Sequence, residues 1–156
     1  MSIEKARAHL AQYGLADRIR EFTTSSATVE LAAQAAGVEP GRIAKSLSFK
    51  LDGRTVLIVA AGDVKVDNAK YKAVFGGKAK MLSPEEAVSL VGYAVGGVCP
   101  FGVNPGVEVY LDQSLRRFET VLPAAGSDNS CVELTLPELE RCAQAAGWVD
   151  VCKARS

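Results

Sequence analysis

Lys45 is a charged residue at a position that the sequence pattern assigns to an apolar face. Residues 45–51, KSLSFKL, alternate with a period of two, and one face of the expected strand holds Leu47, Phe49 and Leu51. By the same alternation Lys45 lies on this face. Removing a lysine from water is costly unless the ammonium has a partner or a task. Two interpretations stay open: Lys45 acts on a ligand, or its aliphatic stem covers apolar surface while the ammonium remains in water.

A second candidate is the glycine-rich stretch GYAVGGVCPFG at residues 92–102. Gly96 and Gly97 lack a Cβ, so a ligand could lie against the backbone, and free N–H groups could bind a carbonyl oxygen or an anion. Pro100 restricts the bend that follows. Such a loop could form an oxyanion-type site. The alternative is purely architectural, a β-bulge or a close crossing of two strands.

Nucleophilic and metal chemistry find weaker support in the residue types. Cys99 would need a base or a lowered pKa to act as a nucleophile, and the single histidine, His9, falls in an expected amphipathic helix. No GxSxG segment indicates a serine hydrolase. The four cysteines form no CxxC pair, so neither a zinc site nor another cofactor is expected. Asp63 follows an expected strand and could line a cleft or cap a helix.

Composition limits the classes of protein that remain. The 156 residues carry 18 Lys and Arg against 18 Asp and Glu, so the net charge is zero. A neutral chain argues against a large footprint on nucleic-acid phosphates but leaves room for a small contact with the end of an RNA. The first residues are charged and amphipathic rather than signal-like, and no run of about 18 apolar residues occurs. We therefore expect a cytoplasmic protein with reduced thiols and no membrane association.

The expected elements form one α+β domain over residues 1–156, with a mixed, mostly antiparallel sheet surrounded by helices. An Asp-Gly pair at 52–53 predicts a hairpin, and capping boxes predict helix starts at Ser83 and Thr135. The predicted helices cover 2–13, 23–37, 65–75, 83–92 and 135–147. The predicted strands cover 19–22, 45–51, 55–61, 79–81, 107–112, 119–125 and 131–136, with an edge strand at 148–152.

Three segments together resemble the YbaK/EbsC family, the free-standing relatives of the editing insertion domain of bacterial prolyl-tRNA synthetase. They are IAKSLSFKLDGRTVLIVAAGD (43–63), GGVCPFG (96–102) and AAGSDNSCVELTLPEL (124–139), and the likeness runs from about residue 25 to 147. The resemblance implies an α+β fold on a barrel-like mixed sheet. It also implies hydrolysis of the ester bond of mischarged aminoacyl-tRNA in trans.

The resemblance assigns roles to particular residues. The family lysine in its K-S/T-L context falls on Lys45, which becomes the candidate catalytic residue, and the family's GxxxP loop falls on residues 96–100. In this assignment the 3′-terminal aminoacyl-adenosine of the tRNA lies against the loop. The candidate substrate-binding residues are Gly96, Gly97, Val98, Cys99, Pro100, Phe101, Gly102, Ser25, Thr28, Asp63 and Ser127. An aminoacyl-tRNA synthetase is a second candidate partner.

The sequence departs from the family pattern at one point. Some branches carry a histidine in the segment that matches AAGSDNS, where Gly126 and Ser127 stand here. No side-chain general base is therefore evident, and the implied mechanism is positioning of the ester for attack by water, aided by the terminal ribose hydroxyl. Two alternatives stay open: a module that binds an aminoacyl-adenosine or nucleotide without turnover, and a thiol-dependent enzyme that uses Cys99.

Overall fold

The computed structural model describes residues 2–155 and is built around one β-hairpin. Strand β2 (Ile43–Leu51) pairs antiparallel with β3 (Arg54–Ala61) along almost its whole length. The turn residues Asp52 and Gly53 have φ angles of 48° and 79°. This left-handed backbone is what a two-residue hairpin turn requires, so the Asp-Gly signal predicted the connection correctly.

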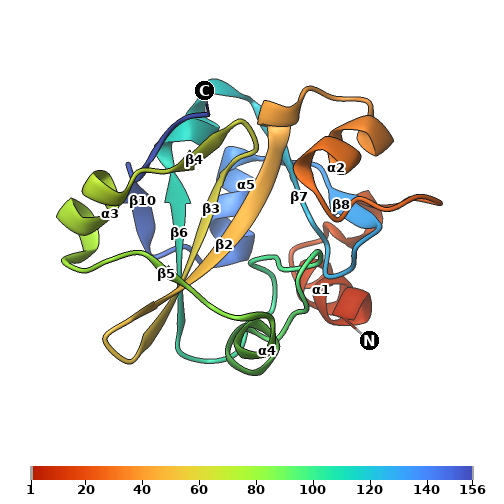
Figure 1. The fold of residues 1–156 in the computed structure, drawn as a ribbon. Helices are drawn as coiled ribbons and strands as arrows, with labels where there is room; N and C mark the ends of the chain where they lie inside the picture. The colour runs from red at the N-terminus through yellow and green to blue at the C-terminus, as the bar shows by residue number, and fades with distance from the viewer. Residues whose placement is uncertain (1, 156) are drawn as a thin grey trace.

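The hairpin lies in the middle of a mixed sheet with the strand order β10-β6-β3-β2-β7-β9, and β5 also pairs with β2. β3 pairs parallel with β6, and β2 pairs parallel with β7. The sheet curls into a half-barrel (Figure 1), which confirms the expected α+β class with a mixed, barrel-like sheet. The other strands of this sheet are β5 (Lys80–Met81), β6 (Val107–Asp112), β7 (Thr120–Pro123), β9 (Leu134–Thr135) and β10 (Gly147–Val149).

Two short antiparallel pairs extend the sheet region. β1 (Ile19–Glu21) pairs with β8 (Ser130–Val132), and β4 (Val64–Val66) pairs with β11 (Cys152–Ala154). The second pair brings the C-terminal residues beside the segment that follows β3. It thereby places residues 64–66 and the C-terminal residues on one side of the molecule.

Helices cover the curled sheet from several sides. In Figure 1, α5 lies behind the sheet, α3 to the left, α2 to the right and α4 below. The capping boxes at Ser83 and Thr135 are both formed, as the sequence predicted. The helix bounds are α1 (Ser2–Ala11), α2 (Val29–Ala36), α3 (Asn68–Phe75), α4 (Pro84–Glu86), which continues as a π-helical turn over Ala87–Val91, and α5 (Leu136–Ala143).

Three predicted helix boundaries are wrong, for identifiable reasons. The helix expected from residue 23 begins only at Val29, because Thr28 is the extended N-cap and its side chain accepts from the Leu31 N–H. The helix expected from residue 65 begins only at Asn68, because residues 64–66 pair with β11 and Asp67 is the N-cap. The last helix ends at Ala143 rather than at Gly147, because Gln144 adopts the left-handed conformation with φ 51°. Gly147 instead begins β10, which pairs parallel with β6.

The core surrounds β3, which is covered on both faces. Every residue from Val56 to Ala61 has 0% exposure, as expected for a central strand without alternation. The core also includes the loop residues Tyr93, Cys99 and Phe101, all at most 1% exposed. Part of the glycine-rich stretch therefore belongs to the interior.

Candidate functional site

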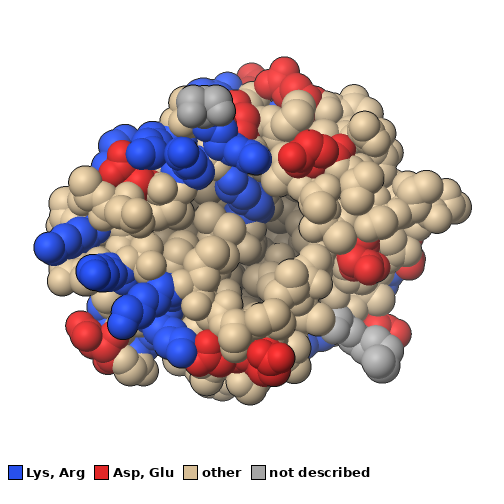
Figure 2. All heavy atoms as spheres, viewed as in Figure 1, with Lys and Arg blue, Asp and Glu red and all other residues tan. Residues whose placement is uncertain are grey.

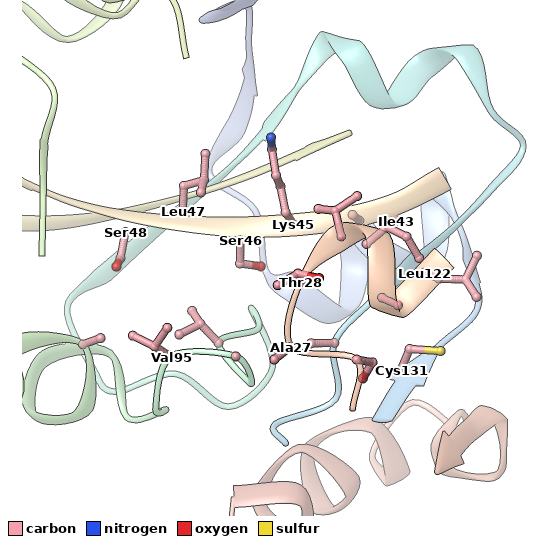
Figure 3. Close-up of a pocket in the computed structure, with 18 of the residues that line it drawn as sticks. Ala27, Thr28, Ile43, Lys45, Ser46, Leu47, Ser48, Val95, Leu122 and Cys131 are labelled. Carbon is pink, nitrogen blue, oxygen red and sulfur yellow. The ribbon is translucent and has the colours of Figure 1, made fainter. Parts of the chain in front are cut away.

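A cavity of about 270 Å³ lies beside the middle of β2 (Figure 3) and opens as a hollow on the face shown in Figure 2. Its walls come from β2, the N-terminal end of α2, the segment around β5 and α4, the glycine-rich loop, and strands β7 and β8. Most of the lining is apolar, with Ala27, Val29, Ala32, Ile43, Leu47, Leu82, Val95, Val98 and Leu122 among the lining residues.

The cavity exists because one edge of β2 is only partly paired. On the side away from β3, β2 pairs with β7 only at Ile43 and Ala44, and with β5 only at Phe49 and Lys50. Between these pairs, the Leu82 N–H donates to the Ser48 carbonyl at 3.1 Å. The main-chain groups of an antiparallel strand alternate in direction, so those of Ser46 point to this same free edge. Ser46 thus presents its backbone to the cavity without a strand partner among residues 2–155.

Two buried hydroxyls that line this cavity lack hydrogen-bond partners. In the described part of the chain, the buried side-chain polar atoms without a partner are Ser26 Oγ, Ser46 Oγ and Tyr71 Oη, and both serines belong to the cavity lining. Leaving such a group unsatisfied costs about 1–3 kcal/mol. Figure 3 shows the Ser46 side chain on the cavity side of β2. The two hydroxyls are therefore available for a polar ligand.

Lys45 also lines the cavity, but its ammonium has a protein partner. The side chain is half-buried, and Nζ donates to the carbonyl oxygen of Val64 in β4. Burial lowers the pKa of Lys45, and the nearby guanidinium of Arg155 lowers this pKa further. Figure 3 shows the Lys45 side chain leaving β2 in the direction opposite to the Ser46 side chain. To reach a ligand beside Ser46, the ammonium would have to leave Val64.

The two adjacent glycines of the loop have different surroundings. Gly96 lines the cavity with φ +95°, and a Cβ there would lie 3.4 Å from the Cβ atoms of Ala27 and Asp128. Gly97 is buried outside the lining, and its Cβ would come within 2.8 Å of the backbone of Gly126 and Ser127. Gly96 thus borders the open space, whereas Gly97 lets two chain segments approach closely.

The second half of the loop packs into the core. Cys99 and Phe101 are 0% exposed, and the Tyr93 hydroxyl donates to the carbonyl oxygen of Phe101. Pro100 is buried as well, and Gly102 packs against α1 with φ +66°. Burial raises the pKa of the Cys99 thiol to about 12. This thiol is therefore protonated near neutral pH, and it is not among the lining residues, which disfavours it as a nucleophile.

Of the remaining predicted site residues, only Thr28 lines the cavity. Its Oγ1 accepts from the Leu31 N–H at 3.2 Å and caps α2. The other three make local contacts outside the lining: Ser25 Oγ accepts from the Ala27 N–H, Ser127 Oγ hydrogen-bonds to Asn129 and Ser130, and Asp63 pairs with Arg117 at 2.5 Å.

Only some of the predicted site residues therefore lie together in the structure. The structure brings Lys45, Thr28, Gly96 and Val98 together around the cavity. It adds Ser26, Ser46 and Cys131, which sequence reasoning did not select. Cys131 is the thiol in the lining, and burial raises its pKa to about 11.

Nowhere in residues 2–155 do three His, Cys, Asp or Glu side chains cluster so that they could hold a metal ion. None of the helices in that range is both long and apolar enough to cross a lipid bilayer.

The close approach at Gly97 predicts a stability effect. Gly97→Ala places a methyl group against the backbone at 126–127, which cannot rotate away, so we expect the free energy of unfolding to fall by about 1–3 kcal/mol. Gly147→Ala is the matched control, because its Cβ meets nothing within 4 Å and φ is not positive. Thermal melting of both variants measures the difference. Equal melting temperatures would contradict the close packing at Gly97.

Comparison with known proteins identifies the family. The model of the aminoacyl-tRNA editing domain family matches residues 23–142. The chain is 53% identical over 98% of both sequences to the uncharacterized protein YwhH of Bacillus subtilis (strain 168). It is also 32% identical to proline–tRNA ligase of a Geobacillus species over 60% of the chain. The matched region is only 17% of the length of that ligase.

A crystal structure described as a candidate trans-editing enzyme for prolyl-tRNA synthetase superposes with a TM-score of 0.88. It is 31% identical and covers 98% of both chains. The likeness therefore extends over the curled sheet and the helices around it. Its sequence and its fold together show that this chain belongs to the YbaK-like aminoacyl-tRNA editing domain family.

Proposed function

We propose that the protein hydrolyses the ester bond of mischarged aminoacyl-tRNA in trans. Membership of the editing domain family supports the substrate class. The observation that carries the proposal is the pair of buried, partnerless hydroxyls, Ser26 and Ser46, in an otherwise largely apolar cavity at a free strand edge. A site of this kind suits a small ligand with one apolar group and several adjacent polar groups, as in an aminoacyl ester.

In the proposed complex, the aminoacyl group lies along the free edge of β2. The main-chain N–H and C=O of Ser46 would pair with the polar atoms of the amino acid, as a strand edge pairs with an extended peptide. The amino-acid side chain would occupy the apolar part of the cavity near Ile43 and Leu122. Gly96, without a Cβ, would leave room for the ribose on the opposite wall.

The proposed reaction is attack by water on the ester carbonyl carbon. The water oxygen forms the new bond, the bond to the ribose oxygen breaks, and the proton from water goes to that oxygen. The products are the free amino acid and the tRNA. Among the described residues that line the cavity none is Asp, Glu or His. Catalysis would therefore rest on positioning and on hydrogen bonds to the developing oxyanion rather than on a side-chain base.

Lys45 would supply positive charge to the bound ester or to the terminal phosphate. This role requires the ammonium to exchange the Val64 carbonyl for the substrate. A charged acceptor is the stronger hydrogen-bond partner, which favours the exchange when substrate is present. The same hydrogen bond to Val64 also keeps a second candidate open, a module that binds aminoacyl-adenosine without turnover, because the Lys45 ammonium already has a protein partner in the free protein.

Removing the Lys45 ammonium should abolish most activity. We expect Lys45→Met, which keeps the apolar stem, to lower single-turnover deacylation about 100-fold, equivalent to about 2.7 kcal/mol in the barrier. Its melting temperature should stay near that of the parent. The assay uses a panel of mischarged tRNAs. Activity within about threefold of the parent would remove Lys45 from the catalytic role.

The unsatisfied hydroxyls predict opposite effects on stability and activity. Ser46→Ala removes a buried group that lacks a partner, so the free protein should be as stable as the parent or more so. The same change should reduce deacylation about tenfold, because the hydroxyl would be paired only in the complex. Ser89→Ala, on the exposed side of the π-helical turn, is the control. A loss of stability without a loss of activity would show that Ser46 is structural.

Because the Cys99 thiol is buried, we expect deacylation to tolerate a substitution at this position. Because its pKa is raised to about 12, we expect Cys99→Ala to retain deacylation within about threefold per folded molecule. We also expect no labelling of Cys99 by a thiol reagent at neutral pH in the native protein. Complete loss of activity, together with labelling that substrate prevents, would instead support the thiol-dependent enzyme.

A further inference from the structure

The basic side chains of this neutral protein differ in whether they have a partner. Most form ion pairs with carboxylates or stack on aromatic rings, including Arg7, Arg18, Arg42 and Arg141. Within residues 2–155, the cations with neither kind of partner are Lys45, Lys65, Lys72, Lys78, Lys80 and Arg155. Apart from Lys45, all of them are exposed.

The elements that carry these exposed, unpaired cations lie on one side of the molecule in Figure 1, and the five cations are called the basic band here. Its members are Lys65 in β4, Lys72 in α3, Lys78 and Lys80 in and before β5, and Arg155 after β11. Figure 2 shows basic side chains gathered beside the hollow, over α3 and β4 as placed in Figure 1, whereas the side over α2 shows almost none. On this face the basic side chains are therefore unevenly distributed, although the net charge of the protein is zero.

The strand register brings like charges together within this region. Lys65 lies opposite Lys153 in the β4–β11 pair, and Lys80 lies opposite Lys50 in the β5–β2 pair. Like charges directly opposite each other in adjacent strands are destabilising. Glu86 and Asp67 partly compensate Lys50 and Lys153, but Lys65 and Lys80 have no such partner among the described residues. An anionic ligand would relieve this repulsion.

The basic band also adjoins the cavity at both ends of the free edge of β2. Lys80 precedes Met81, a lining residue next to the β5 end of that edge. At the other end, Arg155 is near enough to Lys45 to act on its charge, and the Arg155 backbone N–H donates to the Asp63 carbonyl at 3.2 Å. A polyanion lying on the band could therefore deliver its end into the cavity.

We propose that the basic band binds the phosphate backbone of the tRNA acceptor end, so that the RNA approaches over α3, β4 and β5. This inference rests on the proposed function. RNA is favoured over other polyanions because a chain of phosphates ending in an aminoacyl group matches a band of cations ending in a cavity. Five cations would give a slope of about −3.5 to −4.5 in a plot of log affinity against log salt concentration.

The test compares two substrates that carry the same ester. The band variant combines Lys65→Gln, Lys72→Gln and Lys78→Gln, which removes three band cations that are outside the cavity lining. The control variant combines Arg7→Gln, Arg18→Gln and Arg141→Gln, which removes three cations that are paired or stacked. With the mischarged tRNA that the parent deacylates fastest, the band variant should raise KM about 10- to 100-fold and reduce the salt slope by about 2 to 3. With the corresponding aminoacyl-adenosine, both variants should match the parent.

The outcomes separate this inference from the proposed function. An unchanged KM and salt slope with tRNA, or an equal loss in the control variant, would overturn the basic band. A parent that hydrolyses neither substrate would contradict the proposed function. In that case the basic band is tested by binding alone: the affinity for uncharged tRNA is measured for the parent and for the band variant. Equal affinities would overturn the inference. Binding of the parent to anionic vesicles but not to tRNA would assign the band to a membrane surface instead.

Discussion

Strand β2 is paired along one edge but only at the two ends of the other, and the cavity depends on this uneven pairing. A strand edge in a folded protein is normally paired, covered or shielded, because free N–H and C=O groups attract other chains. Here β7 and β5 occupy the ends of the edge and leave the segment around Ser46 free. The surrounding loop and helices enclose that segment, so only a small ligand can use its hydrogen-bonding groups.

The sequence predicted the framework because local signals matched the final structure. The Asp-Gly turn, the two capping boxes and the unbroken apolar run of β3 each specify one element through short-range chemistry. The predicted helix boundaries at 65 and 147 were wrong because residues distant in the sequence pair with these segments. Residues 64–66 form a strand with β11, and residues 147–149 form a strand with β6. Lys45 was found because a single charge interrupted an apolar face.

The rest of the candidate site depends on tertiary contacts that no local pattern encodes. Ser46 lies on what alternation assigns to an ordinary polar face, and only the missing strand partner makes it notable. Cys99 and Cys131 look equivalent in sequence, yet one packs in the core and the other lines the cavity. The clustering of cations is likewise invisible in the composition, because it depends in part on the pairing of β11 with β4, which brings Lys153 opposite Lys65. Each of these features depends on which segments meet.

The contact between Gly97 and the turn at Gly126 and Ser127 has an evolutionary consequence. A side chain at position 97 would push that turn away, and a bulkier or differently shaped turn would push back on the loop that carries Gly96 and Val98. Changes on the two sides of this contact therefore have to occur together. Relatives that place a larger residue at either position should show a compensating change at the other, and the width of their cavity should change with it.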